Sequence, residues 1–433
     1  MMNSVSSMLT KSFLALTAGT LLLAGTTHAE VTALVGATVH PVSSESIDNG
    51  IVLIRNGSID AVGRDLPIPD EARVIELDGL HIYPGFVHPA TQLGITEVFS
   101  VAGTVDTAEM GNINAAVRVE VAVNHDSELL PTSIAGGILS AHIMPGGGLI
   151  RGTSAVMNLD GWSWEEMVIQ APVGMHINFP AGAVDDEDNE DLSLIEEVLD
   201  QARHWHQAQA AAEAGNGRRP ERNDQFEALG PLLAGEIPLF LHANRYDVME
   251  KALDWAESQE FERVILVANP DVQYIAERLA ADNIAVIMSR VYAMPTRRWE
   301  PYDMAFVAAA RLEQAGVRFA LTDSAGGMDV ANARNLPFQA GSAVAHGLSP
   351  DAALKSVTLW PAEILGVDDR LGSLEPGKNA TLFVANGDPL EVFTSIERVW
   401  IDGEEFDLNR DRGRRLYERY RERNAQAQGR DGD

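Results

Sequence analysis

One short stretch, Tyr83 to Gly94 with the sequence YPGFVHPATQLG, separates two kinds of pattern in this chain. Before it, alternating apolar and polar residues are broken by turn residues, which is typical of short antiparallel strands. After it, strand-like apolar runs alternate with helix-like segments, which favours a parallel sheet with crossover helices. The stretch itself has a Pro-Gly corner, an apolar pair and then small and polar residues. This is the pattern of a first barrel strand whose carboxyl end opens into a functional loop.

The β-rich pattern occurs at both ends of the chain. Near the amino end, Asn49-Gly50, Asn56-Gly57 and Asp78-Gly79 are turn signals that predict hairpins. The segment before the carboxyl end has a similar pattern of short apolar runs and turn residues, with LEPGKNATLFVANGDPLEV followed by IERVWIDGEEF. We therefore expect residues 30–84 and 366–408 to pair into one small β-sandwich domain built from both termini.

The middle of the chain, residues 85–365, predicts an α/β fold with a (β/α)8 TIM-like barrel of eight parallel strands. Four strand predictions are the runs IPLFLHA, RVILVANPD, NIAVIMSRV and VRFALTDSAGG. A helix near Val248 to Glu260 and another through Leu279 separate the first three of them, and AFVAAARLEQAG precedes the fourth. In such a barrel, functional side chains sit at the carboxyl ends of the strands.

The two terminal segments fall outside these domains. Residues 1–29 hold Lys11, the apolar run Phe13 to Leu23, and small residues ending at Ala29, which is the pattern of a secretory signal peptide. The apolar run is too short to span a bilayer. We expect an exported, soluble protein, periplasmic or extracellular. Residues 409–433 form a charged, arginine-rich tail that either docks on an acidic face or remains a solvated helix.

Composition narrows the chemistry. The 433 residues include no cysteine, which excludes disulfides, thiolate metal sites and a cysteine nucleophile. A formal net charge of −31 disfavours nucleic acid as a partner. The charge suggests exposure to high salt, although an ordinary acidic exported protein has the same composition. No segment predicts membrane association.

Candidate site residues stand at predicted strand ends. His242 ends one strand and Asp323 ends another, so a barrel would bring both to one mouth. His88 lies in the first predicted strand, while His142 and His176 end short apolar runs before loops. No Gly-x-Ser-x-Gly elbow is present. Hydrolysis of an amide-like bond would then call for a metal-activated water and a carboxylate that moves protons.

Three motifs carry a resemblance to a known family. The chain reads PGFVHPATQLG where the amidohydrolase superfamily reads PGFVDxHxHLG, and GKNATLFV where it reads GKxADLVV. The segment PDAALKSVTLWPAEILGVDDRLGSLEPGK is also similar to the usual sequence of the superfamily in this region. The chain thus resembles that superfamily, in its imidazolonepropionase-like branch, over nearly all of its mature length. The resemblance implies that His242 is a metal ligand, and that Asp323 is both a ligand and the proton acceptor for water.

The sequence departs from the family's metal-binding pattern. Ala90 and Gln92 replace the two strand-one histidines. Ala268, Asn269 and Pro270 stand where a strand-six histidine is usual, and no lysine ends a strand. A two-metal centre is therefore not expected.

We expect instead at most one divalent ion, Zn or Fe, or none. His242 and Asp323 are the predicted ligands, joined by His88 and His176, and His142 and Asn244 are the predicted substrate contacts. The functional prediction is an exported amidohydrolase-type enzyme with a depleted or relocated metal site. Its substrate would be a small molecule: a non-peptide amide, a cyclic amide or a dipeptide-like compound. The alternative is an inactive homologue that binds a ligand or pairs with an intact paralogue, and a homo-oligomer is a further expectation.

Overall fold

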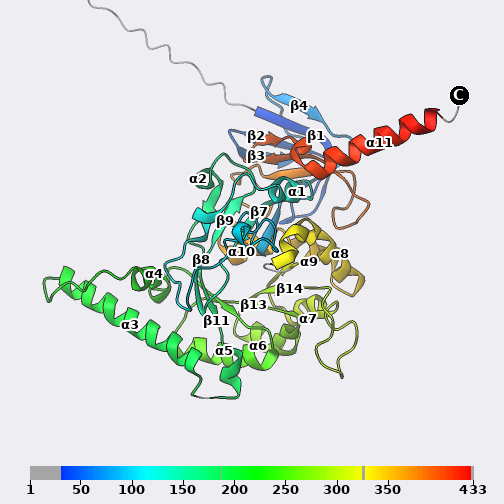
Figure 1. Ribbon diagram of the computed structural model, residues 1–433. Coiled ribbons are helices and arrows are strands. Elements are labelled where there is room, and N and C mark those ends of the chain that lie inside the picture. The colour runs from blue at the N-terminus through cyan, green and yellow to red at the C-terminus, as the bar shows by residue number, and fades with distance from the viewer. Residues whose placement is uncertain (1–30, 187, 324–326, 431–433) are drawn as a thin grey trace, which may run out of the picture.

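The computed structural model describes residues 31–186, 188–323 and 327–430, so the predicted signal peptide lies outside the described residues. The chain has a TIM-barrel-type fold of mixed α/β content, with a β-rich sheet at one end (Figure 1). In the described part of the chain, no helix is long and apolar enough to cross a membrane.

The β-rich sheet joins the two ends of the chain. Its strands are β1 (Val31–Val39), β2 (Ile47–Arg55), β3 (Ser58–Gly63), β4 (Arg73–Glu76), β5 (His81–Pro84), β16 (Leu382–Ala385), β17 (Ile396–Ile401) and β18 (Glu404–Phe406). They form one eight-stranded sheet in which β16 pairs antiparallel with β5. Leu34, Val52, Ile82 and Trp400 pack in its core. The predicted pairing of the two ends is present, whereas the two-layer sandwich and the domain boundaries stay predictions.

The three turn signals of this region have different outcomes. Asn56 and Gly57, with φ values of 50° and 84°, connect β2 to β3 as a hairpin. Asp78-Gly79 turns between β4 and β5, but both of these strands pair in parallel with β1. Asn49-Gly50 lies inside β2, where the register against β1 shifts, so the hairpin predicted there is wrong. A left-handed residue next to glycine also suits a β-bulge.

Two further sheets make up the barrel-type unit. One contains β6 (Phe86–Thr91), β7 (Ile138–Ile143), β9 (Ala155–Asn158) and β10 (Val168–Gln170). The other contains β8 (Ile150–Thr153), β11 (Met175–Asn178), β12 (Leu239–His242), β13 (Val264–Ala268), β14 (Ala285–Ser289) and β15 (Phe319–Thr322). The sheets adjoin at two places. Only Ser154 separates β8 from β9, and the Thr322 hydroxyl at the end of β15 donates to the Ala90 carbonyl of β6 at 3.0 Å.

The expectation that all barrel strands are parallel is wrong at one position. The β8–β9 segment runs antiparallel to both of its neighbours, β7 and β11. The connection from β7 is a short loop that contains Gly146, Gly147 and Gly148, and the last two adopt φ values of 72°. This tight return leaves no length for a crossover helix, and parallel neighbours need one.

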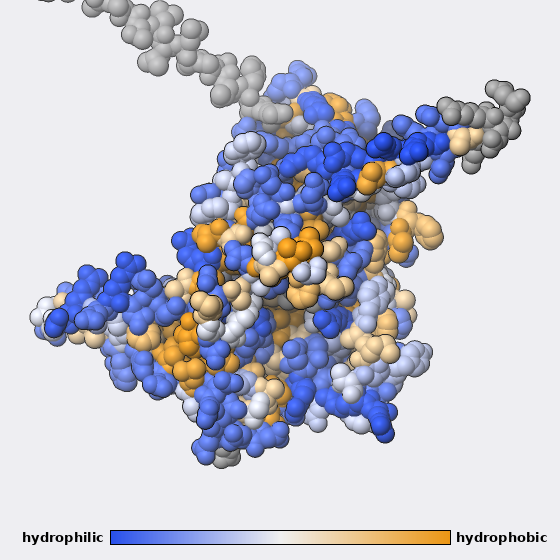
Figure 2. Space-filling view, viewed as in Figure 1, coloured by the Kyte–Doolittle hydropathy of each residue, from blue (hydrophilic) through white to orange (hydrophobic). Residues whose placement is uncertain are grey.

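The helices are α1 (Leu129–Ile134), α2 (Trp164–Met167), α3 (Glu190–Glu213), α4 (Asp224–Leu233), α5 (Tyr246–Ser258), α6 (Ala276–Ala281), α7 (Ala308–Ala315), α8 (Leu336–Ala345), α9 (Pro350–Lys355), α10 (Leu359–Leu365) and α11 (Arg412–Arg430). Short 3-10 turns are η1 (Ala102–Thr104), η2 (Val119–Ala122), η3 (Ala181–Val184), η4 (Pro270–Ile275), η5 (Gly327–Asn335) and η6 (Leu408–Arg410). The predicted helix from Val248 to Glu260 corresponds to α5. Helices α3 and α11 project from the body of the molecule (Figure 1), and their surfaces are mainly hydrophilic (Figure 2).

Candidate active site at the barrel mouth

A cavity of about 1210 Å³ opens at the carboxyl ends of β12 to β15. Its wall includes Arg151, His242, Asn244, Asn269, Thr322 and Asp323. His242 is the last residue of β12, and Asp323 directly follows the last residue of β15. The structure thus places the two principal candidates on one cavity, as expected for strand ends that meet at one rim. Their catalytic and metal-binding roles remain predictions.

Asp323 is held by a histidine from the neighbouring strand. His88 Nε2 lies 3.1 Å from Asp323 Oδ1, and both side chains are buried. The Ala90 main-chain N–H donates to His88 Nδ1 at 3.4 Å, so Nδ1 is the acceptor and Nε2 carries the proton. His88 therefore orients the carboxylate by donating its Nε2–H to Asp323 Oδ1. In this arrangement it is a partner of Asp323 rather than a separate ligand.

A second pair links β11 and β12. His176 Nδ1 and His242 Nε2 are 2.9 Å apart, and the two strands place Asn178 opposite His242. Burial lowers the pKa of both histidines well below the usual value, and their mutual proximity or the Arg151 charge lowers it further. Both rings are consequently neutral near pH 7. The His176 ring also stacks on Phe240, with 4.6 Å between the ring centroids.

His142, a predicted substrate contact, lies away from the cavity wall, and its contact with substrate stays a prediction. Its side chain is fully buried, and it is not among the described residues that line the cavity. Its Nδ1 donates to the Pro89 carbonyl at 2.7 Å, and burial lowers its pKa to about 4. His142 is the last but one residue of β7. Its side chain lies in the apolar interior below the mouth. Asn244, the other predicted substrate contact, is exposed and lines the cavity.

The donor set was tested against the metal centre that the family resemblance implies. Among the described residues, His142 Nε2 and His176 Nε2 are buried without hydrogen-bond partners. Because His142 Nδ1 donates to Pro89, the lone pair of His142 Nε2 is free. However, among the residues that the structure describes, no group of three or more His, Asp or Glu side chains is arranged to hold an ion. The predicted ligands divide into two pairs, His88 with Asp323 and His176 with His242. Two ligands fall short of the three that catalytic zinc sites use, so these residues do not fit a resident metal.

Sequence reasoning missed Arg151 as a site residue. Main-chain amides of the glycine-rich loop before it, residues 146–149, donate to neighbouring carbonyl groups. Gly146 N donates to Thr107 O at 2.6 Å, and Leu149 N donates to Asn112 O at 2.8 Å. The loop delivers Arg151 to the cavity wall. The available signal was an arginine three residues after a glycine run, in a chain with about half as many basic as acidic residues.

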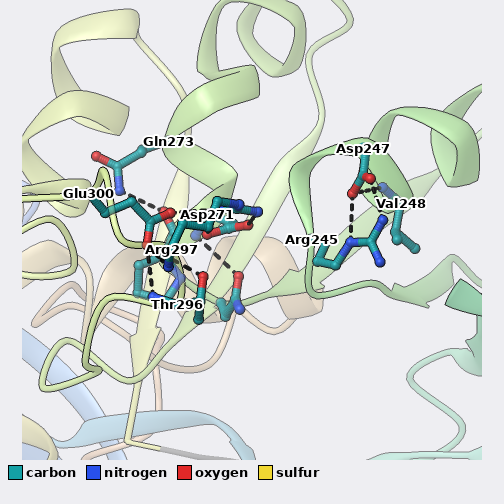
Figure 3. A network of polar contacts seen from close by, with 10 residues as sticks. Arg245, Asp247, Val248, Asp271, Gln273, Thr296, Arg297 and Glu300 are labelled. Atoms are coloured by element: carbon teal, nitrogen blue, oxygen red, sulfur yellow. Dashed lines mark hydrogen bonds and ion pairs between the residues drawn. The ribbon is translucent and has the colours of Figure 1, made fainter.

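A polar network stabilises one wall of the cavity. The 18 or so residues between β14 and α7 contribute Met294, Pro295 and Thr296 to the lining. Arg297 of this segment donates to both oxygens of Asp271 in η4, at 3.1 and 2.5 Å, and it also pairs with Glu300 (Figure 3). The network fixes the long segment against its neighbour and so shapes the cavity.

Comparison with known proteins supports a family assignment. The model of the amidohydrolase family matches residues 264–405. Amidohydrolase tasK from Hapsidospora irregularis is 25% identical over 412 residues, which cover 82% of this chain and 39% of that protein. The putative N-acetylgalactosamine-6-phosphate deacetylase of Escherichia coli (strain K12) is 38% identical over 58 residues, 13% of this chain and 32% of that protein. The chain thus spans well under half the length of these relatives.

Solved structures agree with this assignment. An amidohydrolase from Thermotoga maritima MSB8 superimposes with a TM-score of 0.78 and 26% identity, covering 87% of this chain and 99% of that chain. Molinate hydrolase has a TM-score of 0.54 at 17% identity, covering 88% of this chain and 95% of that chain, and it shares the fold alone. Taken together, the motifs, the family match over residues 264–405 and the shared architecture make this chain similar to the amidohydrolase superfamily.

Proposed function

We propose that the chain is an exported hydrolase that cleaves a carbon-nitrogen bond of a small molecule in the barrel-mouth cavity, with at most one divalent ion, Zn or Fe, or none. The substrate class is a non-peptide amide, a cyclic amide or a dipeptide-like compound. One observation carries the proposal. Asp323, at the end of β15, is oriented by the buried His88 and lines the same cavity as His242. Similarity to the family supports a hydrolase that acts on carbon-nitrogen bonds.

The chain's own groups suit the proton transfers of such a reaction. Asp323 accepts the proton of the attacking water, and the His88 N–H holds one carboxylate oxygen in a fixed direction. Asp323 then returns the proton to the leaving nitrogen. The neutral His242 and the Asn244 amide face the cavity as hydrogen-bonding groups for the substrate. No step is assigned to a metal, because the donor set does not fit one.

A second function rests on a specific observation. The strand-one position of a usual ligand is Ala90, whose side chain is fully buried, and the described residues offer no three-donor group. These features favour a homologue without catalysis that binds a ligand in the same cavity or partners an intact paralogue.

Asp323→Asn separates the two functions. We expect hydrolysis of N-acyl amino acids, dipeptides or hydantoin-like rings to fall by about 100-fold to 10,000-fold, the usual contribution of a general base. The substitution keeps an oxygen for the His88 N–H, so the fold is retained. Asp329→Asn is the matched control, because Asp329 lines the cavity beside Arg290 rather than beside His88. Undiminished turnover in Asp323→Asn would refute the proposed base, and the absence of turnover in the wild type would favour the binding homologue.

A further inference from the structure

Arg151 reaches the barrel mouth because its strand runs in the unusual direction. In β8, Ile150 pairs with Ile177 and Gly152 pairs with His176, so the start of β8 lies beside the end of β11. A parallel strand would have placed its first residues at the opposite end of the barrel. The reversal therefore brings a charged side chain from the beginning of a strand into a cavity otherwise built from the carboxyl ends of strands and the segments that follow them.

The Arg151 side chain is held in place by neutral groups. One of its terminal nitrogens donates to Asn178 Oδ1, and Asn178 Nδ2 donates in turn to the Gly148 carbonyl at 2.6 Å. Because the amide nitrogen of Asn178 is engaged by the loop, its oxygen faces the guanidinium. This chain of contacts orients Arg151 without neutralising its charge.

Arg151 has no acidic partner among the described residues, although the chain carries 63 acidic and only 32 basic residues. Its Nε is buried and makes no hydrogen bond within the described part of the chain. Burial lowers its pKa to about 10, so the group stays mainly protonated at neutral pH. A buried unpaired charge costs stability unless a partner arrives. Arg297, by contrast, has Asp271 and Glu300 as partners.

We propose that Arg151 binds a carboxylate of the substrate, so that the cavity takes anionic amides such as N-acyl amino acids or short peptides with a free carboxyl end. The planar guanidinium matches a carboxylate through two parallel hydrogen bonds. A single guanidinium also matches a single negative charge. A phosphate dianion would call for a second unpaired cation, and the other cavity arginine, Arg290, lies 3.6 Å from Asp329.

The charge of Arg151 is close enough to the candidate catalytic groups for this role. Arg151 lines the same cavity as His242, and Asn178, which accepts a hydrogen bond from Arg151, is paired with His242 across β11 and β12. A carboxylate bound to Arg151 would therefore place its neighbouring amide in the cavity that His242 and Asp323 share. The inference rests on the proposed function, because it takes the binding cavity to be the reaction site as well.

The test compares the affinities of two probes by calorimetry, N-acetyl-L-leucine and its neutral amide, N-acetyl-L-leucinamide. The mature Asp323→Asn protein is used, to prevent turnover. We expect the acid to bind about tenfold tighter or more, since a charge-assisted hydrogen bond is worth that factor. Arg151→Gln should abolish the preference, and Arg151→Lys should keep part of it. Arg290→Gln, at the same cavity but beside Asp329, should leave it intact.

Three results would overturn the inference: equal affinities for acid and amide, no binding of the acid, or a preference that survives Arg151→Gln and disappears in Arg290→Gln. Circular dichroism of each variant confirms that the fold is retained. Failure of the proposed function gives a different pattern. A wild-type protein that prefers the acid through Arg151 yet hydrolyses no member of the panel would contradict the hydrolase and leave the carboxylate site standing.

Discussion

Three neighbouring imidazoles, His242 on the cavity wall and His142 and His176 beneath it, stay neutral for one physical reason. Burial removes the water that would solvate a charged ring, and each ring lies near another positive or titratable group. The His176 ring stacks on Phe240 and is tilted against the His142 and His242 rings, with centroid separations of 4.6 to 5.6 Å. Neutral rings suit hydrogen bonding in the site, and they also link the stability of the fold to pH.

We predict that stability falls as pH drops below about 6.5, the ordinary histidine pKa. In that range these histidines bind a proton in the unfolded chain but stay neutral in the folded protein. Each of them therefore lowers the free energy of unfolding by about 1.4 kcal/mol for each pH unit of acidification. For His142 the effect continues down to its folded pKa of about 4. Urea unfolding at a series of pH values measures the slope.

The control for this prediction uses two histidines. His142→Gln keeps a donor for the Pro89 carbonyl. It should reduce the slope of the free energy of unfolding against pH by the contribution of one histidine. His125→Gln, at an exposed histidine, should leave the slope unchanged. An equal slope in wild type and His142→Gln would show that this ring is not held neutral by the fold.

At the residue scale, the sequence predicted His242 and Asp323 on one rim because both follow apolar runs that end at polar residues. It did not predict how far below the barrel mouth each histidine side chain lies. Strand alternation gives the face of a side chain, whereas burial depends on where neighbouring strands end. His142 was therefore expected in the mouth and lies beneath it. Arg151 was overlooked because its role depends on the direction of its strand.

At the element scale, the strands β12 to β15 follow the sequence pattern closely, since each is a continuous apolar run followed by a helix or helical turn. The β8–β9 segment does not, because a glycine-rich connection can be a turn, a flexible loop or an anion site. Pairing with β7 and β11 resolves this ambiguity, and pairing is not visible in a single sequence. The same limitation explains why Asn49-Gly50 suggested a hairpin and forms a bulge.

The segment between β14 and α7 depends on Arg297. Asp271 and Glu300 are 2% and 8% exposed, and Arg297 is the cation that pairs with both. Burial alone would raise the pKa of Glu300, but hydrogen bonds from the Arg297 and Thr296 main chain and from the Arg297 side chain outweigh it and lower that pKa. Removal of Arg297 would leave two nearly buried carboxylates without this counter-charge.

We predict that Arg297→Met lowers the free energy of unfolding by about 3 to 5 kcal/mol, the usual cost of breaking a buried ion pair. The adjacent, exposed Arg298 provides the matched control, and Arg298→Met should change stability by less than about 0.5 kcal/mol. Denaturant unfolding at neutral pH measures both variants. Similar stability losses in the two would mean that the network does not secure this cavity wall.

At the scale of the whole molecule, a sheet made from both chain ends adjoins a barrel-type unit whose mouth collects residues from five strands or the segments that follow them. The sequence predicted the union of the two ends from their similar texture. It also predicted a depleted metal site, and that stays a prediction. Export, salt adaptation and partner choice remain predictions, because surface charge does not determine a partner.

Metal content of the mature protein tests the central claim most directly, namely that this mouth carries out its chemistry with a depleted donor set. The protein is incubated with Zn²⁺ or Fe²⁺, freed of loosely bound ions, and analysed by mass spectrometry. We expect at most one tightly held ion per chain, and an ion that is held should be lost in His242→Asn. Two tightly held ions per chain would contradict the account.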